Sequence, residues 1–283
     1  MEGSLRLRTR ILSWGVNILG STSPETKTLK LIKTSVVVPF VIALSWCWAF
    51  AQEPPSQPEK KHNPEFGAEM DFNSGYVWRG LLLNDGPVMH PSAWISKSGL
   101  TLLAWSSLPL TTTLETERLK ASGLVLSYEM NWKKLSIEPS VETYFNRSQS
   151  NDASDTTEAL LKFSHRVGPL NVFTTHAFDV VAYRGAYFGE AGLGYEGQLT
   201  KKAILTISVH SGWASSKFND SYIGLPKRAV NLVGAEGSVS YYLKPYLYFR
   251  PHFEFSSIAN GKLRQYLESS TINSFGLALG AEF

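Results

Sequence analysis

The stretch TINSFGLALGAEF, Thr271 to Phe283, alternates between apolar residues and small or polar ones up to its last position. Its apolar positions are Phe275, Leu277, Leu279, Ala281 and Phe283. A period of two is typical of a β-strand, in which successive side chains point to opposite faces. Chain termini are usually polar and frayed. A final phenylalanine therefore indicates a strand that is paired to its end, with one face away from water.

Alternation of the same kind runs back through the chain to residue 65. It predicts twelve strands, at about 65–80, 87–97, 100–108, 121–132, 135–146, 156–166, 170–181, 186–197, 203–214, 228–243, 246–257 and 270–283. Short connections alternate with longer, polar ones along the chain. An even number of strands with such connections is typical of outer-membrane barrels. The pattern predicts an all-β fold over residues 65–283, a transmembrane antiparallel up-and-down β-barrel of twelve strands.

The two faces of the strands support this prediction. In the first strand Phe66, Met70 and Phe72 share one side, whereas Glu69 and Asp71 share the other. Aromatic residues gather near strand ends, as in the interface girdles of membrane proteins: Tyr76, Trp78, Trp132, Tyr144, Tyr241, Tyr242, Tyr246 and Tyr248. An open sheet edge in hydrocarbon would leave each backbone amide unsatisfied, at a cost of several kcal/mol. We therefore expect the last strand to pair with the first, and Phe283 to face lipid.

Two prolines conflict with a sheet in which every strand is central. Pro139 and Pro251 fall inside predicted strands, where proline cannot donate a ladder hydrogen bond. They are expected either at bulges or at positions whose N–H would lack a partner. The sequence leaves both alternatives open.

The N-terminal part is predicted to be a targeting segment. The apolar run of residues 35–50 follows Lys27, Lys30 and Lys33 and ends at a small-x-small site, Ala49 to Ala51. These features predict a signal peptide over residues 1–51, with the first 26 residues either an extension or the result of an early start codon. Residues 52–64 are Pro-rich and charged and are predicted to form a disordered periplasmic leader.

Composition excludes several classes of protein. Residues 1–51 hold six of the 27 basic and two of the 24 acidic residues, so the remainder carries 21 basic and 22 acidic residues. This balance gives no basic surface for nucleic acid. The single cysteine, Cys47, lies in the predicted signal peptide, so the exported domain is expected to be stabilised without disulfides.

The strand phase predicts which charged side chains face the barrel lumen. The expected pore-lining residues are Glu69, Asp71, Arg79, Glu129, Glu138, Glu142, Lys162, Asp179, Glu190, Glu236, Arg250, His252 and Glu254. An acidic wall predicts a mildly cation-selective channel for passive passage of small solutes or ions. Alternatively, the carboxylates are neutralised by Arg79, Lys162 and Arg250. For Arg79 itself a bracing salt-bridge network is preferred to a constriction, although the two roles are compatible.

Enzymatic and metal-binding functions have weaker support. A hydrolase would need a serine, a histidine and an acid converging on one face. The strand phase puts only His252 inward, beside Glu254, and puts His165, His176 and His210 on the apolar side. No catalytic residue, metal site or cofactor is predicted, so the protein is not expected to be an enzyme. An outer-membrane hydrolase of lipase or esterase type and a structural or adhesive barrel remain the alternatives.

The stretch from Asp71 to Ser107 resembles the opening of the TorF family of proposed porins. Tyr76, Arg79, Gly80, Asp85, Gly86 and Gly99 match the motifs of that family. The resemblance implies an outer-membrane barrel with a pore role and no assigned solute. A terminal Phe283 after Phe275, Leu277 and Leu279 also resembles the assembly signal of bacterial outer-membrane proteins. The expected location is the outer membrane of a Gram-negative bacterium, and the expected partners are its lipid, its assembly machinery and small solutes or cations.

Overall fold

A computed structural model describes residues 64–111, 120–147 and 154–283. The predicted signal peptide and nearly all of the leader lie outside these ranges. The strands are β1 (Glu65–Asn73), β2 (Tyr76–Trp78), β3 (Leu81–Asn84), β4 (Val88–Lys97), β5 (Leu100–Pro109), β6 (Lys120–Tyr128), β7 (Met130–Trp132), β8 (Leu135–Arg147), β9 (Thr156–Val167), β10 (Leu170–Asp179), β11 (Tyr187–Thr200), β12 (Ala203–Ala214), β13 (Ala229–Lys244), β14 (Leu247–Ile258) and β15 (Thr271–Glu282). A helix, α2 (Ser216–Ile223), and a 3-10 turn, η2 (Leu263–Tyr266), lie in connections.

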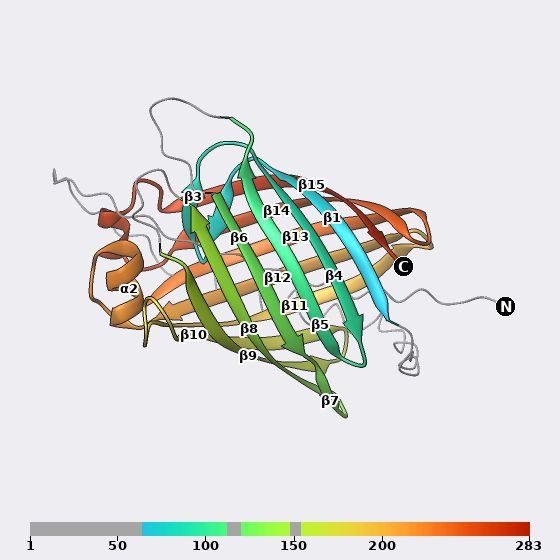
Figure 1. The fold of residues 1–283 in the computed structure, drawn as a ribbon, viewed down its shortest axis with the longest axis horizontal. Coiled ribbons are helices and arrows are strands. Elements are labelled where there is room, and N and C mark those ends of the chain that lie inside the picture. Colours follow the sequence, from blue (N-terminus) through green and yellow to red (C-terminus); the bar gives the residue numbers. More distant parts are fainter. Residues whose placement is uncertain (1–63, 112–119, 148–153) are drawn as a thin grey trace, which may run out of the picture. The chain divides into compact units, whose positions relative to one another are not determined.

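The strands close into the predicted antiparallel barrel (Figure 1). Neighbours follow the order β6-β5-β4-β1-β15-β14-β13-β12-β11-β10-β9-β8-β7, and β6 also pairs with β8, which closes the ring. Since β6 and β7 together form one wall strand and the β2–β3 hairpin is separate, the wall has twelve strands. The twelve-stranded, closed, antiparallel barrel predicted from the sequence is therefore confirmed.

Closure between the last and first strands occurs as predicted. The register of β1 and β15 pairs Gly67 with Glu282 and continues to Asn73 with Gly276. At the end of this ladder, Phe66 and Phe283 exchange both backbone hydrogen bonds, at 3.1 and 2.8 Å. The ring of Phe283 stacks on Phe66 and on Tyr246, each with 5.4 Å between centroids. The last residue thus links the end of β15 to β1 and to the turn before β14 on the outer face.

We expect Phe283→Asp to lower the yield of folded barrel several-fold, because it removes both stacking contacts and places a charge on the apolar exterior. Phe283→Leu is the matched control and should remain near the wild-type level. Heat-modifiable migration in electrophoresis measures the folded fraction. Wild-type yield from the aspartate variant would contradict the role assigned to this junction.

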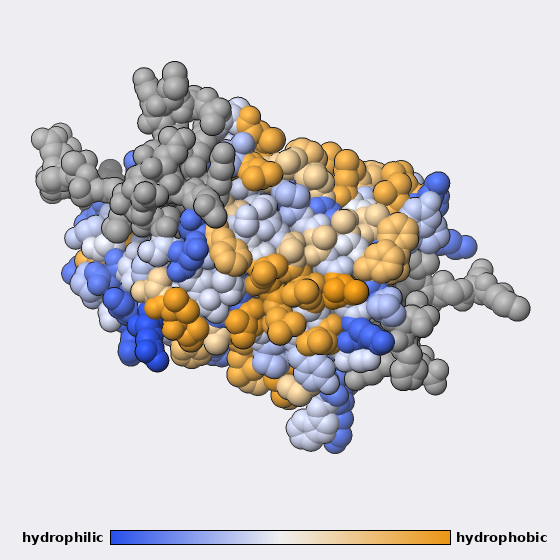
Figure 2. Space-filling model, viewed as in Figure 1, coloured by the Kyte–Doolittle hydropathy of each residue, from blue (hydrophilic) through white to orange (hydrophobic). Residues whose placement is uncertain are grey.

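The outer surface is apolar around the middle of the barrel. Figure 2 shows hydrophobic residues across the middle of the face in view and hydrophilic ones toward both ends. Exposed apolar side chains include Leu102, Leu124, Leu126, Phe145, Val172, Phe178, Leu277 and Leu279. Such an exterior is what a lipid environment requires of a transmembrane barrel. Within the described ranges, no helix is long and apolar enough to cross a membrane.

The predicted aromatic girdle is only partly correct. Trp132, Tyr241 and Tyr246 are exposed on the outer surface. In contrast, Tyr76, Trp78, Tyr144 and Tyr248 are buried inside the barrel. Alternation alone could not separate the two groups, because an aromatic residue suits either a lipid interface or a packed interior.

Both strand prolines lie where one of the two neighbouring ladders is interrupted. Pro139 pairs with Leu161 on β9, and on its other side the wall strand breaks between β6 and β7. Pro251 pairs with Leu277 on β15 but has no registered partner on β13. No bulge occurs at either residue. Of the two alternatives, the prolines therefore occupy positions whose missing N–H leaves no ladder partner unsatisfied.

Candidate functional site: the barrel lumen

The connection after β1 turns into the barrel instead of extending the strand. The predicted first strand, 65–80, ends at Asn73, and residues 76–84 form the separate β2–β3 hairpin. Tyr76 and Trp78 on this hairpin are only 1% and 3% exposed. Such burial requires the hairpin to lie among the side chains of the lumen. The prediction that this segment continues the wall is wrong, because its apolar residues pack against interior residues rather than lipid.

The tip of the hairpin is fixed by a buried ion pair. Arg79 donates from both terminal nitrogens to the two carboxylate oxygens of Glu158 on β9, at 2.8 and 2.6 Å. The two side chains are 8% and 2% exposed. Around the ring of wall strands, β9 is five strands from β1 in one direction and seven in the other. The ion pair therefore joins the hairpin to a nearly opposite part of the wall.

Aromatic rings surround the guanidinium of Arg79. Its central carbon lies 4.4 Å from the ring centroid of Trp78 and 4.9 Å from that of Phe188 on β11. Burial opposes its charge, yet the adjacent Glu158 carboxylate holds the pKa of Arg79 above its ordinary value. Arg79 is thus a permanent cation in a bidentate, stacked geometry that lysine could not reproduce.

The backbone conformation at the tip of the hairpin also restricts which residues can occupy it. Arg79 and Gly80 have φ of 48° and 81°. A Cβ atom on Gly80 would lie 3.0 Å from Ile258 and 3.1 Å from Leu232. Glycine at this position supplies both the left-handed backbone and the close approach to β13 and β14.

Helix α2 packs beside the hairpin at the end of the barrel that carries the longer loops (Figure 1). Ser215 caps the helix by accepting from the Phe218 N–H at 3.1 Å, and Gly224 ends it with φ of 81°. The rings of Phe218 and Tyr222 lie 5.8 and 5.0 Å from Trp78. With Leu263 of η2, these residues join one buried apolar cluster. This cluster narrows the loop end of the lumen.

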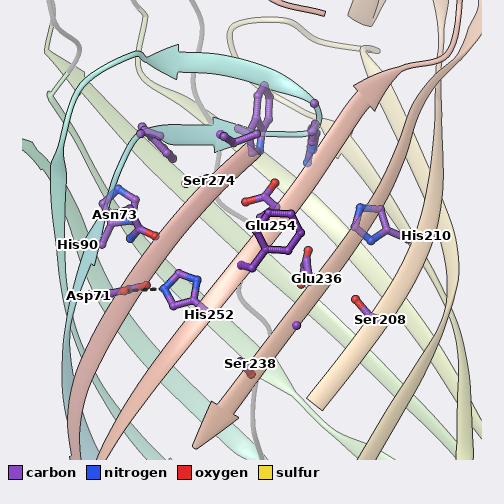
Figure 3. Close-up of a pocket in the computed structure, with 18 of the residues that line it drawn as sticks. Asp71, Asn73, His90, Ser208, His210, Glu236, Ser238, His252, Glu254 and Ser274 are labelled. Atoms are coloured by element: carbon purple, nitrogen blue, oxygen red, sulfur yellow. Dashed lines mark hydrogen bonds and ion pairs between the residues drawn. The ribbon is translucent and has the colours of Figure 1, made fainter. Parts of the chain in front are cut away.

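Beyond the hairpin the lumen contains a polar cavity of about 150 Å³. Figure 3 shows its side chains converging from several strands of the wall. The charged or histidine residues that line it are Glu69, Asp71, Arg79, His90, Glu190, His210, Glu236, Arg250, His252 and Glu254. Its apolar boundary includes Trp78 and Leu232. The cavity is thus a charged chamber bounded on one side by the apolar cluster.

Two of the cavity carboxylates have side-chain partners. Glu69 on β1 accepts a 2.6 Å hydrogen bond from the Tyr248 hydroxyl and forms a 2.5 Å ion pair with Arg250. Asp71 lies 2.9 Å from His252 Nε2 (Figure 3). Both links connect β1 to β14 across β15, and the Glu69–Arg250 pair places a positive charge beside a carboxylate at this part of the wall.

Three other carboxylates remain without such partners. Glu190 on β11, Glu236 on β13 and Glu254 on β14 make no side-chain hydrogen bond or ion pair with any residue that the structure describes. Glu236 and Glu254 are direct partners in the strand register and lie side by side in Figure 3. Excess acidic charge in the cavity is therefore concentrated on these strands.

Several residues expected to line the pore lie elsewhere. Glu142 is 5% exposed and Asp179 is 2% exposed, both away from the cavity. Asp179 instead accepts from Thr156 and from the backbone N–H groups of Val181 and Tyr183, which fixes the connection after β10. Its expected pore-lining role is contradicted by this capping geometry.

The remaining predicted residues lie toward the turn end. Glu129, at the break between β6 and β7, accepts hydrogen bonds from Asn131 and Ser136. Glu138 and Lys162 are register partners on β8 and β9. None of the three lines the described cavity.

The strand phase missed two histidines and one acid. His90 and His210 line the cavity, so the assignment of His210 to the apolar face is wrong. Its ring lies over the β13 backbone, where a Cβ on Gly234 would be 2.3 Å from His210 Nε2. His210 alternates along β12 with the polar residues Ser208 and Thr206, and this pattern could have predicted that it faces the lumen. Glu158 was missed because its partner Arg79 comes from the inward hairpin.

Comparisons with known proteins assign no family. No protein family and no curated protein matches the chain in sequence, so the resemblance to the TorF family is not confirmed. Among solved structures, the KdgM porin has 12% identity and a TM-score of 0.45, over 77% of this chain and 99% of that chain. The NanC porin has 11% identity and a TM-score of 0.49, over 76% and 98%. An outer membrane channel from Pseudomonas putida F1 has 10% identity and a TM-score of 0.46, over 82% and 100%.

Proposed function

We propose that this protein is an outer-membrane channel for passive passage of small solutes or ions, with a mild preference for cations. The observation that carries the proposal is a charged cavity inside a closed barrel whose exterior is apolar. A polar lumen behind a lipid-compatible wall has no use in packing alone, since apolar side chains would fill the same space at lower desolvation cost. It suits transfer of hydrophilic solutes.

The structure also supports a narrow passage. Twelve strands enclose a lumen between those of side-chain-filled eight-stranded barrels and open sixteen-stranded porins. The β2–β3 hairpin and the apolar cluster reduce that lumen further at the loop end. We therefore infer that conductance is small and is limited at the hairpin, where Arg79 serves both as brace and as part of the constriction.

Cation preference would come from Glu190, Glu236 and Glu254. Fixed carboxylates in a narrow tube raise the local concentration of cations and exclude anions. The preference should fade at high salt, because the Debye length falls to roughly 3 Å at 1 M. Arg250 and Arg79 reduce the field, but each is already paired with another carboxylate.

Reversal potentials in a salt gradient test this proposal. We expect modest cation selectivity in the wild type and a loss of most of it in Glu236→Gln/Glu254→Gln, which removes two negative charges from the cavity. Glu65→Gln/Glu268→Gln removes the same charge from exposed positions and is the matched control. Anion selectivity of the wild type would contradict the proposal, as would equal selectivity in the two double variants.

A hydrolase is the second candidate, and the described residues give it less support. His90 Nε2 lies 3.0 Å from the Ser107 hydroxyl, which is a serine–histidine pair of the expected kind. Ser107 is only 1% exposed, and the Tyr76 ring lies 4.9 Å from the ring of His90. A substrate carbonyl would have to displace the docked hairpin to reach this hydroxyl. We infer a structural role for this pair.

A further inference from the structure

The paired carboxylates Glu236 and Glu254 are an unusual feature of the wall. They stand directly opposite each other on adjacent antiparallel strands. Opposite side chains in such a pair have Cβ atoms roughly 4.5–5.5 Å apart, and like charges placed there are destabilising. The neighbouring carboxylates Glu69 and Asp71 each have a partner, whereas these two have none among the described residues. A cation bound between the two carboxylates would relieve this repulsion.

Buried hydroxyl groups at the same cavity are a second, independent observation. Thr206 on β12 is 8% exposed, and its hydroxyl has no hydrogen-bond partner within the described ranges. Tyr76 on the hairpin is 1% exposed, and its hydroxyl also has no hydrogen-bond partner among the described residues. Both residues line the cavity. Buried polar groups are normally satisfied, so an unpartnered group that borders a cavity indicates a bound solute or water there.

The lining and the volume of the cavity favour an organic cation. No group of three or more histidine, aspartate or glutamate side chains in the described part of the chain is arranged to hold a metal ion. The cavity of about 150 Å³ is bounded by apolar groups of Trp78 and Leu232 on one side and by carboxylates on the other. A cavity of similar volume accommodates a molecule of the size of benzene. Such an amphipathic chamber suits an ammonium group attached to a short apolar chain.

We propose that the cavity is a binding site for small organic ammonium ions, with the ammonium group between Glu236 and Glu254 and the apolar part toward Trp78. Glu190 adds a third negative charge to the wall, and Thr206 offers a hydroxyl acceptor. The proposal rests on the proposed channel function in that the solute must reach the cavity through the lumen. It names primary amines as a substrate class of that channel.

Calorimetric titration of the folded protein in detergent micelles tests the site without any requirement for conduction. Butylamine is the probe at neutral pH, and 1-butanol and butyrate are its neutral and anionic counterparts. We expect saturable binding of butylamine and at least about tenfold weaker binding of the other two, since charge-assisted hydrogen bonds to carboxylates are the strong ones. Equal affinity for butylamine and 1-butanol would overturn the proposal.

Variants then locate the site. Glu236→Gln/Glu254→Gln should weaken butylamine binding about tenfold or more, whereas the control Glu65→Gln/Glu268→Gln should bind as the wild type does. If the double variant does not fold, Thr206→Val and Glu254→Gln are measured separately, and each should weaken binding several-fold. Unchanged affinity in the folded cavity variants overturns the site. If the folded barrel binds butylamine saturably but passes no current, the channel proposal is contradicted and the binding site is supported.

Discussion

Replacing residues 75–86 with a short Gly-Ser linker should raise the single-channel conductance several-fold. These residues contain the whole β2–β3 hairpin, which packs inside the lumen and contributes Tyr76, Trp78 and Leu81 to the buried apolar cluster. The wall should survive the replacement, because Asn73 and Val88 are register partners on β1 and β4 and a tight turn can join them. Ionic current through planar bilayers measures the effect, since current follows the narrowest part of the pore.

Two controls make this result interpretable. Heat-modifiable migration establishes that the shortened barrel is folded. Exclusion of neutral polymers of graded size then reports whether the pore itself has widened. Unchanged conductance and unchanged exclusion size in a folded barrel would show that the hairpin is not the constriction.

Breaking the Arg79–Glu158 pair should produce the largest loss of stability. Removing one member of a buried ion pair leaves an uncompensated charge, at a cost of about 3–5 kcal/mol. Arg79→Met and Glu158→Gln should each lower the free energy of unfolding by such an amount. The double variant should lose much less than the sum, because neither charge is then left alone. Urea unfolding of the barrel in lipid vesicles gives the four free energies of the cycle.

The Arg250–Glu69 pair provides the matched control for that cycle. Its side chains are 17% and 12% exposed and border the cavity, so water can reach them. Arg250→Met should therefore cost less than Arg79→Met. Additive losses for Arg79→Met and Glu158→Gln would mean that the pair does not hold the hairpin, and the account of the constriction would fail.

The wall of the barrel was predictable because it follows from local pattern. Period-two alternation located the wall strands, and the short turns at Ser98–Gly99 and Gly168–Pro169 occur as expected. The need to satisfy every backbone amide in lipid predicted closure, which β1 and β15 provide. The sequence also shows that Pro139 and Pro251 fall inside strands. Only the register shows that each lies where one of its two neighbouring ladders has no paired residue.

The contents of the lumen were less predictable, because they depend on contacts between residues far apart in the chain. Arg79 was expected on the wall and instead crosses the lumen to Glu158, which is 79 positions away. Strand phase predicts inward positions for seven residues that line the cavity: Glu69, Asp71, Glu190, Glu236, Arg250, His252 and Glu254. Phase could not show that Glu142 and Asp179 are buried away from the cavity, nor that Glu236 and Glu254 stand opposite each other. Which side chains stand opposite each other follows from the strand register, which the alternation of a single strand does not give.

Single-channel recording of the purified wild-type protein in planar bilayers tests the central claim most directly. The account predicts small, discrete conductance steps, carried preferentially by cations at low salt and less selectively at high salt. Complete absence of current from folded protein under every salt and voltage condition would contradict it.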